Sequence, residues 1–319
     1  MSKYFHFVAA AAVGCGLGWV LATMCGTLLA EPPVVAPVPR ASGFSSYDVL
    51  LAFGDSITQL GGDPELGGFV ARLSNLYQRQ MDVVNRGFSG YNASLAISVA
   101  DSVFPAARPA DSAQNSSSHQ ESAGSGIIWP DRDSNAPGAA ARVQLCLLFF
   151  GANDAVEKGG WQHNPIEQYE RDLRYLIALL RDPASRHYAP HTRILLITPP
   201  AVSDRMAADM AQHISLFQYV SQRSSRRYAD VTLGVARAAS IPVVDFNAAI
   251  VKKVEERAAS TNDTGAYGGY EQYLADGLHL TAGGNELLYN LIVAEIKHSW
   301  PELMPPLPPK AMVVTPDGT

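Results

Sequence analysis

Cysteine is scarce in this sequence, and the three cysteines that occur form no recognisable pattern. Cys15 and Cys25 fall in an apolar N-terminal stretch, and Cys146 lies in an apolar run typical of a buried strand. Such an arrangement predicts no disulfide framework. No cysteine or histidine pair has the spacing of a zinc ligand set, so we expect no metal ion.

Basic residues are also few, and they form no run. The chain has 24 Lys and Arg against 30 Asp and Glu, which gives a formal net charge of -6. A negative protein has no long-range attraction to nucleic acid or to anionic lipid head groups. Because no nucleic-acid-binding motif occurs either, nucleic acid is not an expected partner. The hydrophobic content of 47% is that of a globular protein with a sizeable core.

Only one hydrophobic run is long, and it occupies residues 5–30. It can cross a hydrocarbon core about 30 Å thick, and it exceeds the usual signal-peptide core of about 7–15 residues. We therefore expect residues 1–30 to form a signal anchor in the membrane. Lys3 would then stay in the cytosol, and the folded domain would be lumenal or extracellular. A cleaved signal peptide and a secreted protein are the alternative.

The composition changes three more times along the chain. Residues 31–46 are rich in proline, which predicts a semi-stiff linker. The folded domain is expected at 47–309, followed by a tail at 310–319. Within that domain, residues 104–141 are rich in Ser, Asn, Ala and Pro without an apolar period, which predicts a low-complexity surface insertion.

The rest of the folded domain alternates between two kinds of pattern. Short apolar runs with little polar alternation indicate strands covered on both faces; they are Val49–Phe53, Met81–Val84, Val143–Phe150, Ile194–Thr198 and Ile241–Val244. Helical patterns lie between and after them: Leu66–Arg79, Ala93–Val103, Ile166–Leu180, Ala207–Ala239 and Ala282–His298. This alternation predicts an α/β fold, a three-layer α/β/α sandwich with a mainly parallel five-stranded sheet.

Reactive residue types follow the first three strands and precede the last helix. The four blocks are Gly54–Thr58, Asn85–Gly90, Gly151–Asp154 and Asp276–His279. In an open parallel sheet, ligands bind beyond the carboxyl ends of the strands. We therefore expect these blocks to meet at one edge of the sheet.

Their chemistry is that of acyl transfer. A serine hydroxyl needs a neighbouring base, and Ser56 with His279 supplies that pair. Asp276 stands three residues before His279 and can hold the imidazole in the correct tautomer. The oxyanion of a tetrahedral intermediate needs hydrogen-bond donors. The candidates are the backbone N–H groups of Ser56 and Gly90 and the side-chain amide of Asn153.

Several neighbouring residues have supporting interpretations. Asp55 is expected to brace the turn that carries Ser56, and Asp154 to hold its own loop through hydrogen bonds to backbone. Asp245, after the fifth strand, is interpreted as a helix cap rather than as the triad acid, since no histidine follows three residues later. Trp161, His163 and Phe88 are candidates to line an acyl or alcohol pocket.

The four blocks resemble those of the SGNH (GDSL-like) hydrolase superfamily, and most closely its isoamyl acetate-hydrolysing esterase branch. The segments that carry the likeness are FGDSIT, VNRGFSGYNAS, FFGANDA, DGLHLTAGGNELLYNLI and WPELMPPLPP. The resemblance covers roughly residues 49–309. It implies a flavodoxin-like fold and hydrolysis of short or medium acyl esters, small molecules, without a metal or organic cofactor. The apolar N-terminus and the insertion are foreign to that branch.

Three other functions remain open at this point. The same machinery could hydrolyse thioesters or lysophospholipids, or transfer an acyl group to a hydroxyl. A binding domain without catalysis is disfavoured because the nucleophile and the base are both present. The proline-rich segment Pro301–Pro309 could instead serve as a docking ligand. Nothing in the sequence indicates the oligomeric state.

Overall fold

The computed structural model describes residues 48–106, 142–261 and 265–305, all within a compact unit, Gly43–Thr319. The predicted signal anchor, the linker and most of the insertion and tail lie outside these residues. Across the described ranges, no helix is both long enough and apolar enough to cross a membrane.

The centre of the domain is a five-stranded parallel sheet with the strand order β2-β1-β3-β4-β5. The strands are β1 (Asp48–Gly54), β2 (Met81–Gly87), β3 (Val143–Phe149), β4 (Arg193–Ile197) and β5 (Val243–Val244). The predicted parallel five-stranded sheet is confirmed. Because β1 lies between β2 and β3, the segment that follows β1 has the segments after those two strands on either side.

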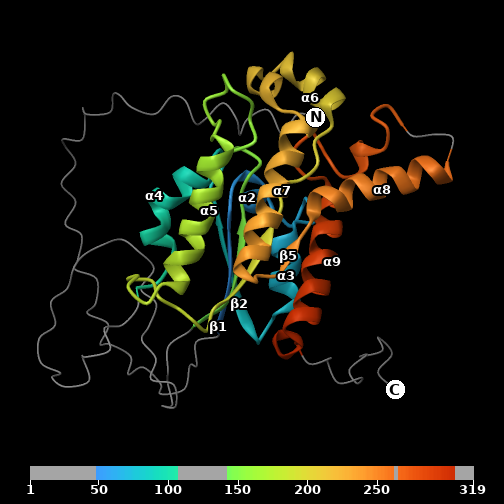
Figure 1. The fold of residues 1–319 in the computed structure, drawn as a ribbon. Helices are drawn as coiled ribbons and strands as arrows, with labels where there is room; N and C mark the ends of the chain where they lie inside the picture. Colours follow the sequence, from blue (N-terminus) through green and yellow to red (C-terminus); the bar gives the residue numbers. More distant parts are fainter. Residues whose placement is uncertain (1–47, 107–141, 262–264, 306–319) are drawn as a thin grey trace, which may run out of the picture. The chain divides into compact units, whose positions relative to one another are not determined.

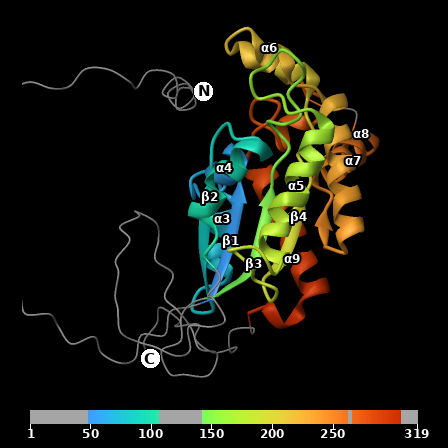
Figure 2. The ribbon, with the colours of Figure 1, turned by 60° about the vertical axis from the view of Figure 1, so that its left-hand side comes forward.

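Helices cover both faces of this sheet (Figures 1 and 2). They are α2 (Ser56–Leu60), α3 (Phe69–Leu76), α4 (Ala93–Val103), α5 (Ile166–Arg181), α6 (Asp204–Ala211), α7 (Gln222–Ala239), α8 (Phe246–Ser260) and α9 (Ala282–Ser299). Short 3₁₀ helices are η2 (Ser215–Tyr219), η3 (Tyr270–Gln272) and η4 (Pro301–Leu303). Figure 1 shows α4 and α5 on the left of the sheet and α9 on the right.

Alternate side chains of each strand enter two separate cores. From β1, Leu50 and Ala52 pack with α3, α8 and α9, whereas Leu51 and Phe53 pack with α4, α5 and α7. This follows from the two-residue period of a strand, which sends successive side chains to opposite faces. The three-layer α/β/α sandwich is therefore confirmed.

The helix predicted across Ala207–Ala239 is wrong. The segment divides into α6, the turn η2 and α7, because Ser221 caps a new helix by accepting a hydrogen bond from the backbone N–H of Ser224 at 3.2 Å. Phe217 of η2 is buried and anchors the connection. A cap competes with a continuous helix, and apolar periodicity does not reveal it.

Other boundaries also differ from the expectations. The helix α3 begins only after Gly68, three residues later than the pattern indicated. Phe104, placed at the start of the insertion, belongs to the core, where its ring lies 5.6 Å from that of Phe53 in an edge-to-face arrangement. The structure describes the predicted insertion only at its first residues.

Candidate active site

Ser56 begins α2 directly after β1, the strand between β2 and β3. Asp55 caps that helix, since its carboxylate accepts a hydrogen bond from the backbone N–H of Ile57 at 2.9 Å. This hydrogen bond caps the helix at the turn between β1 and α2. Ser56 is only 8% exposed, so it is buried rather than on the open surface.

Ser56, His279 and Asp276 form a continuous chain of hydrogen bonds. The Ser56 hydroxyl lies 2.9 Å from His279 Nε2, and His279 Nδ1 lies 2.7 Å from Asp276 Oδ2. A carboxylate can only accept, so Nδ1 carries the ring proton and Nε2 is left to accept from the serine. The structure thus brings together residues 223 positions apart in the tautomer that general-base chemistry requires.

The loop that carries this pair is closed by its own backbone. Asp276 Oδ1 accepts from the N–H groups of Leu278 and His279 at 3.0 and 2.8 Å. The N–H of Ala275 also donates to the carbonyl of His279 at 2.8 Å. Gly277 allows the tight turn with a φ of +99°, a conformation that other residues rarely adopt. The Asp276 carboxylate is therefore held in place by the backbone of its own loop.

The two side chains shift each other's pKa in opposite directions. Burial alone would raise the pKa of Asp276, but the charge and hydrogen bonds of His279 outweigh it and lower that pKa to about 2. Burial alone would lower the pKa of His279, but the nearby Asp276 carboxylate raises it above the ordinary value for histidine. The pair therefore favours the imidazolium next to a carboxylate.

Gly90 and Asn153 lie on the loops that flank Ser56. Gly90 has a φ of +82° in a turn closed by the Tyr91 N–H and the Phe88 carbonyl, 3.1 Å apart, which is the place for glycine in a type II turn. Asn153 follows β3, and its Nδ2 donates to the carbonyl of Tyr91 at 2.8 Å. The two predicted oxyanion loops are thus joined directly.

Gln162 contacts both loops and was missed by the sequence analysis. Its Nε2 donates to Asn153 Oδ1 at 2.6 Å and to the Gly90 carbonyl at 3.1 Å. A single glutamine in a loop, without a motif around it, carries no signal that could have identified it.

Asp154 is fully buried behind Asn153. Its carboxylate accepts from the backbone N–H of Ala93 at 2.9 Å and from Asn164 Nδ2 at 2.8 Å, so it ties its loop to the start of α4. Desolvation raises the pKa of Asp154 to about 7, and that of Asp55 to about 7 as well. The Asp154 carboxylate therefore links the loop after β3 to Ala93 and Asn164 through hydrogen bonds.

Asp245 is not part of this group. Its Oδ1 accepts from the backbone N–H of Ala248 at 3.0 Å and so caps α8, as expected. The other carboxylate oxygen lies 3.5 Å from the Arg226 guanidinium.

The pocket candidates differ in their surroundings. Trp161 is 72% exposed and stands beside Gly90, where an added Cβ atom would lie 3.5 Å from its ring. His163 instead bonds back to its own loop, with Nδ1 2.6 Å from the carbonyl of Val156. Phe88 packs edge-on against Phe53, with ring centroids 6.1 Å apart. Trp161 is the one of these three with a broadly exposed face.

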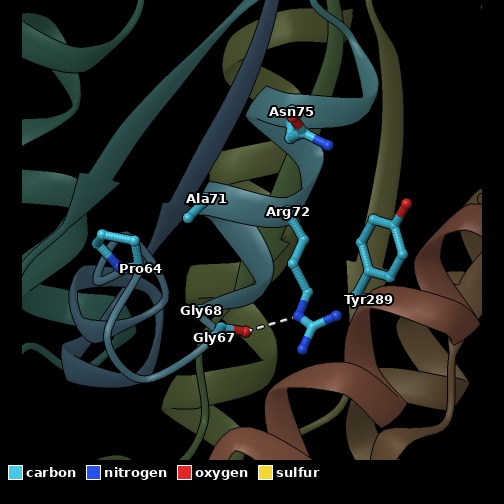
Figure 3. Close-up of a pocket in the computed structure, with 7 residues that line it drawn as sticks. All are labelled: Pro64, Gly67, Gly68, Ala71, Arg72, Asn75 and Tyr289. Atoms are coloured by element: carbon cyan, nitrogen blue, oxygen red, sulfur yellow. Dashed lines mark hydrogen bonds between the residues drawn. The ribbon is translucent and has the colours of Figure 1, made fainter. Parts of the chain in front are cut away.

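A shallow depression also lies between α3 and α9 (Figure 3). Its lining residues are Pro64, Gly67, Gly68, Ala71, Arg72, Asn75 and Tyr289. Arg72 crosses it and donates from Nε to the Gly67 carbonyl at 2.8 Å (Figure 3). None of the predicted site residues lines it. In the part of the chain that the structure describes, no group of three His, Cys, Asp or Glu side chains could hold a metal ion.

The model of the GDSL-like lipase/acylhydrolase family matches residues 52–287, which include all four blocks. The chain belongs to that family. The resemblance inferred from the motifs is confirmed, and family membership makes the protein a carboxylic ester hydrolase.

Relatives of this GDSL-like esterase include an isoamyl acetate-hydrolyzing esterase 1 homolog of Mus musculus, 30% identical over 75% of this chain and 78% of that protein. The isoamyl acetate-hydrolyzing esterase of Saccharomyces cerevisiae is 23% identical over 81% of this chain and 90% of its own. Among solved structures, the acetyl xylan esterase AlAXEase is similar, with a TM-score of 0.51 and 16% identity over 77% of this chain and 98% of that chain. This last likeness concerns the fold alone.

Proposed function

We propose that the protein is a serine esterase that hydrolyses small carboxylic esters with short or medium acyl groups through an acyl-enzyme intermediate. The observation that carries the proposal is the hydrogen-bonded chain from Ser56, at the end of β1, through His279 to Asp276. In this proposal Ser56 is the nucleophile, His279 the general base and acid, and Asp276 the acid that orients it.

The reaction runs in two halves. His279 Nε2 takes the hydroxyl proton while Ser56 Oγ bonds to the ester carbonyl carbon, and the carbonyl oxygen becomes an oxyanion. The carbonyl re-forms as the alkoxide leaves, and His279 returns the proton to it, which releases the alcohol. Water then gives a proton to His279 Nε2 as it attacks the carbonyl carbon of the acyl-serine. The bond to Ser56 Oγ breaks, His279 returns the proton to that oxygen, and the carboxylic acid leaves. One ester and one water become one acid and one alcohol.

The charges that develop have partners within the site. The imidazolium forms next to the Asp276 carboxylate, 2.7 Å from Nδ1, where the opposite charge stabilises it. The oxyanion would receive hydrogen bonds from the backbone N–H groups of Ser56 and Gly90 and from Asn153 Nδ2. The Asn153 amide is already oriented by its hydrogen bonds to the Tyr91 carbonyl and Gln162, so little reorganisation of this donor is needed during the reaction.

The proposed substrate class rests on the relatives and on the rim of the site. Several relatives are named isoamyl acetate-hydrolyzing esterases, so a short acyl group on an apolar alcohol is the proposed ester. The exposed indole of Trp161 beside Gly90 offers an apolar face at the entrance. We propose that this face contacts the alcohol or acyl part of the ester.

Two measurements test the proposal. A fluorophosphonate probe should label the full chain and should not label Ser56→Ala; labelling of that variant would overturn the assignment of the nucleophile. Nitrophenyl esters of increasing acyl length should show the highest kcat/KM for short chains. A maximum at long chains, or turnover of a lysophospholipid or thioester above that of acetate esters, would replace the proposed substrate class.

A further inference from the structure

The orientation of the Asn153 amide is determined by its neighbours. The carbonyl of Tyr91 can only accept, so the nitrogen of Asn153 must face it and Oδ1 must face Gln162. Gln162 in turn must present its nitrogen, since the Gly90 carbonyl, 3.1 Å away, also only accepts. Two main-chain carbonyls thus define the direction of both amides.

This direction matters because an amide has two ends of nearly equal shape and opposite polarity. If Asn153 turned over, Oδ1 would face the Tyr91 carbonyl and its NH₂ would face the NH₂ of Gln162. Both contacts would be repulsive. With Oδ1 held by Gln162, the second N–H of Asn153 Nδ2 is free to donate to an oxyanion, whereas the reversed amide would present a lone pair to a negative charge.

The same glutamine also restrains the turn at Gly90. Its hydrogen bond to the Gly90 carbonyl restrains the peptide group between Gly90 and Tyr91. The orientation of that peptide sets the ψ angle of Gly90, which has no Cβ atom to restrict it. Tyr91 is held from its other side by Asn153 Nδ2. Gln162 therefore acts on both loops from which the proposed oxyanion donors come.

Gln162 is itself held rigidly. It is 3% exposed, and its backbone carbonyl accepts from Asn92 Nδ2 at 2.9 Å. The next two residues of its loop are also held by backbone hydrogen bonds. The N–H of His163 donates to the Gly160 carbonyl, and the N–H of Asn164 donates to the Asp154 carbonyl. Contacts within the protein therefore hold Gln162 in place.

Burying the Gln162 side chain costs free energy, and packing alone does not explain why a glutamine is found there. Gln162 Oε1 is buried and has no hydrogen-bond partner among the described residues. Turning the amide would not help, because the oxygen would then face the Gly90 carbonyl and Asn153 Oδ1. A buried polar atom without a partner destabilises a fold, and a methionine of similar size would avoid that cost. The two donated hydrogen bonds are what the glutamine supplies.

We infer that Gln162 is a positioning residue, which holds the Asn153 amide and the Gly90 turn in the orientation that the oxyanion of the ester requires. The inference rests on the proposed function. Gln162 donates to the site residues rather than to the substrate, so its effect belongs to the transition state and not to substrate binding.

The test is Gln162→Met in the full chain, assayed on nitrophenyl acetate. We expect kcat to fall about 10-fold with KM within about twofold, because the lost interaction matters in the transition state. Gln168→Met is the matched control: Gln168 Nε2 also donates at 2.6 Å, to Asp172 on α5, and touches neither loop. It should keep wild-type kinetics. If Gln162→Met is not recovered folded, Gln162→Asn, one methylene shorter, carries the same expectation.

A double-mutant cycle separates positioning from general loosening. In an Asn153→Ala background, Gln162→Met should lower kcat by no more than about threefold, because its main target is gone. An equal fall in both backgrounds, a change in KM alone, or wild-type kinetics for Gln162→Met would each overturn the inference. If Ser56→Ala is inert while Gln162→Met is unaffected, only the role of Gln162 fails. Activity retained by Ser56→Ala would overturn the proposed function itself.

Discussion

Replacing Asp276 by asparagine should damage this site in a specific way. Asp276 Oδ1 accepts hydrogen bonds from two backbone N–H groups, so the oxygen of an asparagine must occupy that position. The NH₂ group then falls where Oδ2 stands, 2.7 Å from His279 Nδ1 in the native chain. It would donate to Nδ1 and move the ring proton to Nε2. The histidine could then no longer accept the proton of Ser56.

The size of the effect has two parts. The charge and hydrogen bonds of His279 outweigh burial and lower the pKa of Asp276 from 3.8 to about 2. The carboxylate therefore stabilises the imidazolium, and an uncharged amide would not. The unfavourable tautomer adds to this loss. Together they predict a fall in kcat of about 10²–10⁴ for Asp276→Asn.

The assay is kcat and kcat/KM on nitrophenyl acetate from pH 4 to pH 9. Loss of the carboxylate removes the charge that raises the pKa of His279, so the acidic limb of kcat/KM should move to lower pH. Asp245→Asn is the control, since Asp245 caps α8 away from the triad and asparagine is also a good cap. It should stay within a few-fold of wild type. The reasoning would be refuted if kcat decreased by less than fivefold in Asp276→Asn, or if it decreased more in Asp245→Asn than in Asp276→Asn.

Three more results are expected. Asn153→Ala should lower kcat by about 10²–10³, measured on the same ester, because one oxyanion donor is lost; a wild-type kcat would exclude Asn153 from the oxyanion site. Trp161→Ala should raise KM about 3- to 10-fold for apolar esters and less for small polar ones, and a uniform KM would contradict a contact with substrate. Desolvation raises the pKa of Asp55 to about 7, above its unfolded value of 3.8, so the wild-type fold loses stability as pH rises through that interval. The melting temperature of Asp55→Asn, relative to wild type, should therefore increase between pH 4 and pH 8; a constant difference would show that Asp55 does not titrate there.

Local pattern was sufficient for most of the fold. The strand Val143–Phe149 appears as a short apolar run because both of its faces are covered by helices. Helix α4 has the bounds that its pattern indicated, since Asn92 caps it and its alanines face the core. The division of residues 207–239 did not follow from periodicity, because side-chain capping at Ser221 acts between residues three apart and leaves the apolar spacing unchanged.

The sequence by itself determined which residues are candidates for the chemistry. Ser56, Asn153 and the Asp276–His279 pair stand at strand and loop positions that local pattern reveals, and their residue types limit the reaction to acyl transfer. What only the tertiary structure decided is how they are held. The order β2-β1-β3 places the Gly90 and Asn153 loops on either side of Ser56. Gln162 then fixes the direction of an amide on another loop. Such a contact depends on two loops meeting in space. It cannot be predicted from the residue types of Gln162 and Asn153 or from their neighbours in the chain.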